Sequence, residues 1–173
     1  MKLLLLLLTL IQVPIISRYL SYREATHSAY AVSSSIANVP NERQTQLIKA
    51  FGEKYFDSLR IRVGSPLYVS SLYRSVALNN AIGGAKVSEH MILADVVACD
   101  IDQDEKGKVG NRALFFIIQY QTTYRKLIWE FGTTTAPQWV HVSWSPYPDR
   151  NIKKVYRAKR VQNRVIYTLF NSY

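Results

Sequence analysis

Two histidines bracket an acidic residue in this chain, and this arrangement constrains the fold more than any other feature. His90 is followed ten residues later by Asp100, and His141 lies in an apolar stretch between Trp139 and Trp144. The chain has only three histidines, so two of the three belong to this set. Two imidazoles and one carboxylate from separate elements form a ligand set that holds Zn²⁺ and leaves one position open. The pattern predicts a fold that gathers these side chains around one divalent ion, as in a zinc hydrolase.

The spacing of apolar residues predicts both helices and strands. From Glu42, apolar residues recur at three- and four-residue steps as far as Leu59 or Ile61, with Asn41 as the N-cap, which indicates a long helix. Shorter helices are expected over 75–82 and 111–120, and strands over 67–73, 96–101, 127–131 and 139–144. These elements predict an α+β domain: a small, mainly antiparallel sheet with helices packed to one side and the zinc site at the sheet.

Alternation in the last of these strands gives the sharpest local prediction. Because successive side chains of a strand point to opposite faces, Trp139, His141 and Ser143 should share one face. Val140 and Val142 should share the other.

The length of 173 residues allows one domain with a sizeable core. A lysine followed by an apolar run opens the chain, and the run is shorter than the roughly 20 residues that span a bilayer. Residues 1–18 are therefore expected to be an export signal, a retained membrane anchor or a buried segment. The folded domain is expected over 19–160, with a C-terminal tail over 161–173. The basic residues 150–164 and the apolar residues 167–173 are expected to form either an extra strand or this tail. The single cysteine, Cys99, excludes an intrachain disulfide.

Charge indicates the chemistry of the partners. The formal net charge is +10, which favours nucleic acid, acidic lipid or anionic cell-wall polymers. Residues 150–160 are the most basic stretch. Charge alone does not choose among these partners.

Six motifs occur in order along the chain, and together they support a family resemblance. They are Tyr73-Arg74-Ser75-Val76-Ala77-Leu78-Asn79, Gly83-Gly84, Ser88-Glu89-His90, Ala98-Cys99-Asp100-Ile101, Leu127-Ile128-Trp129-Glu130-Phe131-Gly132 and Trp139-Val140-His141-Val142-Ser143. Over residues 19–158 the chain resembles the zinc D-Ala-D-Ala carboxypeptidase family, in its phage-type branch of peptidoglycan peptidases.

The resemblance implies an activity and a site. It implies a Zn²⁺ peptidase that cuts peptide bonds in the stem or cross-bridge of peptidoglycan, with metal ligands at His90, Asp100 and His141. It implies that Arg74 binds the substrate carboxylate or steadies the scissile carbonyl. It also implies a role in degrading the host cell wall, as an exported or membrane-anchored protein or as a phage or virus protein.

Two departures from the family pattern put this interpretation to the test. The first histidine and the aspartate are ten residues apart in place of the family's usual seven, so Asp95 rivals Asp100 as the ligand. Many family members carry an acidic residue three positions before the last histidine, where this chain has Gln138, and an amide cannot take a proton from water. A family member that has lost catalysis and only binds the wall is therefore an alternative.

With Gln138 unable to serve, Glu130 is the best remaining candidate for the general base. The competing structural role is an ion pair between Glu130 and Arg74 or a cap on the sheet. Ser88 is expected to bind near the metal or to cap a turn, and Trp139 is the tryptophan expected to touch substrate.

A basic virion or nucleic-acid-binding protein is the alternative from another class, because of the net charge and the basic residues 150–160. Contact with a membrane through residues 1–16 is a further expectation. The sequence leaves open which peptide bond is cut.

Overall fold

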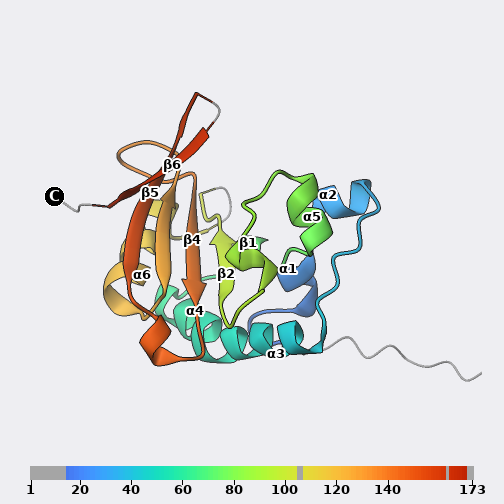
Figure 1. The fold of residues 1–173 in the computed structure, drawn as a ribbon. Helices are drawn as coiled ribbons and strands as arrows, with labels where there is room; N and C mark the ends of the chain where they lie inside the picture. The colour runs from blue at the N-terminus through green and yellow to red at the C-terminus, as the bar shows by residue number, and fades with distance from the viewer. Residues whose placement is uncertain (1–14, 105–106, 163, 171–173) are drawn as a thin grey trace, which may run out of the picture.

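One mixed sheet of six strands organises the molecule, and a computed structural model describes its residues 15–104, 107–162 and 164–170 (Figure 1). The strand order is β1-β2-β4-β3-β5-β6. Every neighbouring pair is antiparallel except β3 and β5, which run parallel. The strands are β1 (Val69–Ser71), β2 (Val97–Ile101), β3 (Lys126–Glu130), β4 (Trp139–Trp144), β5 (Lys154–Val161) and β6 (Arg164–Leu169). The predicted α+β class and mostly antiparallel sheet are confirmed.

A long helical segment follows Asn41, as predicted. The Asn41 side chain accepts from the backbone N–H of Gln44, and the Gln44 side chain returns a bond to the Asn41 backbone, forming a capping box. The segment runs through α3 (Glu42–Phe51), one π-helical turn η1 (Gly52–Phe56) and α4 (Asp57–Val63). It ends at Gly64, whose φ of 68° is the left-handed conformation that terminates many helices.

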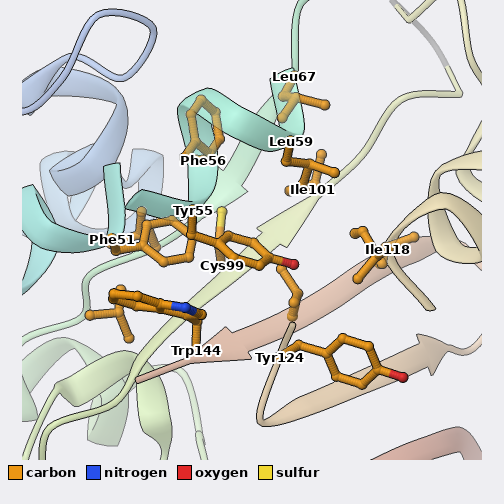
Figure 2. Close-up of a cluster of buried hydrophobic side chains, with 14 of the residues drawn as sticks. Phe51, Tyr55, Phe56, Leu59, Leu67, Cys99, Ile101, Ile118, Tyr124 and Trp144 are labelled. Carbon is orange, nitrogen blue, oxygen red and sulfur yellow. The ribbon is translucent and has the colours of Figure 1, made fainter. Parts of the chain in front are cut away.

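Helices α3, α4 and α6 (Asn111–Gln121) cover one face of the sheet, and the core lies between them and the strands (Figure 1). Figure 2 shows part of this cluster, with Phe51, Tyr55 and Trp144 packed together. The Phe51 ring lies 5.3 Å from Tyr55 and 6.2 Å from Trp144, centroid to centroid. Cys99 is fully buried in the same cluster as a free thiol.

The predicted alternation in β4 is present. Val140 and Val142 are completely buried in the helix-covered core. Trp139 and His141 face the opposite side of the sheet, where they line a cleft. The sheet therefore has one face that stabilises the fold and one face that carries polar side chains.

Short elements close the β1 side of the molecule. They are α1 (Tyr22–Thr26), α2 (Ala29–Ser33), α5 (Val76–Ala81) and the 3-10 turn η2 (Glu89–Met91). A second 3-10 turn, η3 (Pro148–Arg150), connects β4 to β5. The segment 67–73 contributes only a three-residue strand, shorter than expected.

The described C-terminal residues form an added strand, one of the two alternatives expected for this region, rather than a tail. Residues 164–169 form β6, which pairs with β5 from Val161↔Arg164 to Tyr156↔Leu169 and extends the sheet. The basic stretch 150–160 accordingly contains most of β5 rather than a free tail.

At the other end, residues 1–14 of the expected signal or anchor lie outside the described residues, and Ile16 is buried in the core. Among the described residues, no helix has the length and apolar character needed to cross a membrane.

Candidate metal centre and cleft

His90, Asp100 and His141 converge on the open face of the sheet. Each offers one ligand atom, and these three atoms lie within 4.8 Å of one another. All three residues are buried, and the two imidazole centroids are 5.1 Å apart. The expected convergence of residues from three separate elements is therefore present.

The position of His90 is fixed by the turn η2 and by the chain that follows β1. Ser88 is the N-cap of this turn and accepts from the backbone N–H of His90. The backbone N–H of Arg74 donates to the carbonyl of His90. The ring nitrogen Nδ1 lies 2.7 Å from the carbonyl oxygen of Leu72. Since a carbonyl only accepts, Nδ1 carries the proton and Nε2 keeps its lone pair for a metal.

Strand pairing sets Asp100 beside His141. The two residues are direct partners across β2 and β4, so their side chains share one face. Asp100 Oδ1 lies 2.8 Å from His141 Nδ1, and Asp100 Oδ2 lies 3.2 Å from His90 Nε2. Arg74 donates to Asp100 Oδ2 at 2.9 Å and to Ser71 Oγ at 2.8 Å. Arg74 thus holds the aspartate that the two histidines face.

The donor set fits a zinc ion. Ligand atoms about 2.0–2.2 Å from Zn²⁺ at tetrahedral angles are about 3.3–3.6 Å apart. The three ligand atoms lie within 4.8 Å of one another, so side-chain shifts of about 1 Å bring them to this spacing. Three ligands leave the fourth position free, as in catalytic rather than structural zinc sites.

The charges around Asp100 reinforce its anionic form. Burial alone raises the pKa of a carboxyl group, but the adjacent His90 and His141 lower the pKa of Asp100 far below its usual range. Burial lowers the pKa of His90. For His141, burial also acts to lower the pKa, and the hydrogen bond to Asp100 with the neighbouring carboxylates outweighs it and raises the pKa. The site therefore presents a permanent carboxylate between two imidazoles.

A cleft of about 990 Å³ opens above the three residues. Five parts of the chain line it. They are the segment after α5, the turn η2, the open face of the central strands, the β3–β4 connection and the C-terminal hairpin of β5 and β6. Its lining includes Arg74, Gly83, Gly84, Ser88, Glu89, His90, Asp100, Lys126, Ile128, Glu130, Phe131, Trp139, His141, Tyr156, Arg160, Val165 and Tyr167. A site of this size accommodates a peptide segment.

Glu130 is a buried carboxyl group at the end of β3 and faces this cleft. Burial raises its pKa to about 7, with Asp100 adding to the rise and His141 and Arg74 opposing it. Within residues 15–104, 107–162 and 164–170, no group hydrogen-bonds or ion-pairs with the Glu130 side chain. The alternative pairing of Glu130 with Arg74 is absent there, because Arg74 binds Asp100.

The family model described as Peptidase M15 matches residues 18–143, which is most of the chain. The matched region includes His90, Asp100 and His141, and also Arg74 and Glu130. The chain belongs to the peptidase M15 family. This is the zinc D-Ala-D-Ala carboxypeptidase group, whose members are zinc peptidases acting on peptidoglycan-type substrates. No curated protein matches the chain.

The structure shows where the remaining residues singled out in the sequence lie. Ser88 and Trp139 line the cleft. Asp95, the rival ligand, lies at the surface in ion pairs with Arg43 and Arg150, apart from the two histidines. Gln138 is exposed and lies outside the cleft, where its backbone N–H donates to the Glu130 carbonyl.

One part of the cleft wall was not expected from the sequence: the part that comes from the β5–β6 hairpin. Tyr156, Arg160, Val165 and Tyr167 all line the cleft. Tyr156, Ala158 and Arg160 are spaced two residues apart, so they lie on one face of β5 and alternate with the residues of its other face. This two-residue period is typical of a strand with one exposed face. That signal was present in the sequence but was obscured by the density of lysine and arginine in the same segment.

Proposed function

We propose that this M15 chain is a zinc peptidase that hydrolyses a peptide bond of the peptidoglycan stem or cross-bridge, as a D,D-carboxypeptidase or as an endopeptidase. The observation that carries the proposal is the buried His90, Asp100 and His141 group at the floor of a cleft large enough for a peptide. Zinc held by these residues would polarise the scissile carbonyl and make water nucleophilic at neutral pH.

Glu130 supplies the proton transfers. Peptide hydrolysis requires a group that takes a proton from the attacking water and returns it to the leaving amine. Glu130 faces the cleft two residues along β3 from Ile128, the neighbour of His141 across the sheet. A pKa near 7 allows the same carboxyl group to accept and to donate at neutral pH. With Glu130 of β3 as the base, the glutamine at position 138 is no obstacle to catalysis.

Arg74 and Trp139 orient the substrate. The Arg74 guanidinium holds Asp100 through Nη2 and Ser71 through Nε, and it also lines the cleft. Its planar set of donors suits a carboxylate or a carbonyl oxygen of the bound peptide. Trp139 offers an aromatic surface on the face that carries His141.

We further propose the setting in which this activity is used. The order of the six motifs supports the phage-type branch and hence degradation of a host cell wall, and the apolar residues 1–16 support export or membrane anchoring. The net charge of +10 supports attraction to the anionic polymers of a cell wall.

Hydrolysis of purified peptidoglycan, with and without a chelator, tests the proposed function. We expect release of peptide fragments or free D-alanine by the zinc-loaded protein, loss of release on metal removal and recovery on adding zinc back. His141→Ala should abolish both zinc retention and hydrolysis, because it removes one of three ligands.

The matched control is His27→Ala. His27 is exposed after α1, away from the cleft, so this variant should keep full activity. Unaltered hydrolysis in the presence of chelator, or in His141→Ala, would contradict the proposed function.

A further inference from the structure

The β5–β6 hairpin supplies one wall of the cleft, although it lies outside the residues that match the peptidase M15 model. The match ends at residue 143, whereas β5 begins at Lys154 and β6 ends at Leu169. The hairpin extends the sheet beyond β3, and in Figure 1 it stands at the edge of the molecule opposite β1. This wall is therefore an addition to the part of the cleft that the family match covers.

Strand register places the hairpin residues relative to the reacting groups. The row Asp100, His141, Ile128 and Tyr156 crosses β2, β4, β3 and β5. Two residues further along the strands, the next row on the same face contains Trp139, Glu130, Ala158 and Tyr167. Arg160 follows Ala158 by two residues and pairs with Val165. At about 3.3 Å per residue, the Arg160 backbone lies about 7 Å beyond the row of the proposed base and about 13 Å beyond the row of the metal ligands.

The other two long cations of the cleft, Arg74 and Lys126, are each held by an acidic side chain. Arg74 is paired with Asp100 at 2.9 Å, and Lys126 is paired with Glu89 at 2.9 Å. In the part of the chain that the structure describes, Arg160 has no acidic partner. Its guanidinium carbon lies 5.5 Å from the centre of the Phe131 ring, a cation–π contact that holds the side chain against the cleft wall. A guanidinium that lines a cleft and has no acidic partner is suited to bind an anionic group of a ligand.

We propose that Arg160 binds a carboxylate of the peptide substrate, on the Glu130 side of the scissile bond. This inference rests on the proposed function, because it takes the substrate to be a peptide bound along the cleft. An extended peptide advances about 3.3–3.6 Å per residue, so the carboxylate belongs to a residue about two to four positions from the bond that is cut. Val165 and Tyr167 supply the adjoining surface of this subsite.

A pair of stem peptides tests this assignment. Both have the same sequence, with the second-residue glutamate joined through its side chain and the two terminal D-alanines present. In one peptide the main-chain carboxylate of the glutamate is free, and in the other it is amidated. Binding is measured calorimetrically with zinc-loaded protein in a Glu130→Gln background, so that neither peptide is consumed.

Arg160→Gln should weaken binding of the free-carboxylate peptide about five- to tenfold and change binding of the amidated peptide less than twofold. Arg160→Lys should restore part of the loss. Lys159→Gln is the matched control, since it removes the same charge from the neighbouring residue, whose exposed side chain lies on the other face of β5 and outside the cleft. Zinc content should be equal in all variants, because Arg160 touches none of the three ligands.

Equal losses for the two peptides, equal losses in Arg160→Gln and Lys159→Gln, or no binding of either peptide would overturn the assignment. Hydrolysis by the chain with Glu130 intact separates this result from the proposed function. Zinc-dependent cleavage without a preference for the carboxylate would leave the proposed function standing and overturn the role of Arg160. A carboxylate preference in binding, without cleavage by any zinc-loaded protein, would support the role of Arg160 and overturn the proposed function.

Discussion

The pKa values of two buried carboxyl groups in the cleft shift in opposite directions. Burial raises the pKa of both, but Asp100 has His90 and His141 against its oxygens and stays anionic, whereas the pKa of Glu130 rises to about 7. Divergent environments of this kind assign different tasks to chemically similar groups. Asp100 is suited to holding a cation, and Glu130 is suited to moving a proton.

Replacement of Glu130 by glutamine should lower kcat by about 100- to 10,000-fold, the usual contribution of a general base, with zinc content unchanged. The active form of Glu130 is the deprotonated one. In the wild type, kcat/KM should therefore rise with pH through a value at or below about 7, because a bound cation favours the carboxylate. The pH profile of kcat/KM and the metal content of both proteins check this. If Glu130→Gln keeps the wild-type kcat and the same rise of kcat/KM with pH, Glu130 is not the general base.

At the scale of elements, the sequence was informative where the pattern is local. The capping box at Asn41 fixed the start of the helical segment, and alternation placed His141 on the open face of β4. The segment continues to Val63, two residues beyond the expected end at Ile61, because Val63 is a further buried position four residues after Leu59 and Gly64 then ends the helix.

The pairing of the strands could not be predicted from the sequence. Which strands pair, and in what register, depends on contacts between distant residues. The approach of Arg160 to Phe131 follows from the parallel pairing of β3 with β5, and no short stretch of sequence encodes it. The choice of Asp100 over Asp95 followed the residues around each aspartate. Its physical reason is the direct pairing of Asp100 with His141 across two strands.

The N-terminal segment is tied to α4 through one carboxylate. Asp57 accepts hydrogen bonds from Ser17 Oγ at 2.8 Å and from the backbone N–H groups of Arg18 and Tyr19, each at 3.1 Å. Asp57→Ala should lower the free energy of unfolding by about 1–3 kcal/mol, because it leaves these donors without their acceptor. Urea denaturation measures the loss, and proteolysis near residue 18 should become faster.

The control is Asp149→Ala, at an exposed carboxylate in η3, which should change stability by less than about 0.5 kcal/mol. Equal stability of the two variants would show that Asp57 does not anchor the segment.

In the whole molecule, the two faces of the sheet have different roles. Helices α3, α4 and α6 bury one face and fix the strand positions, and the other face presents the candidate metal ligands, Glu130 and the cleft. The region matched to peptidase M15 carries the candidate metal ligands and the proposed base, and the β5–β6 hairpin adds a wall that contains Arg160. A net charge of +10 is consistent in sign with an anionic substrate.

Anomalous scattering from crystals grown with one equivalent of zinc, with data collected on both sides of the zinc absorption edge, tests the central claim most directly. We expect a single strong peak per chain, about 2.0–2.2 Å from one atom each of His90, Asp100 and His141. A peak elsewhere, a peak bound by only one of these residues, or no peak at all would contradict the assignment of this site as the metal centre.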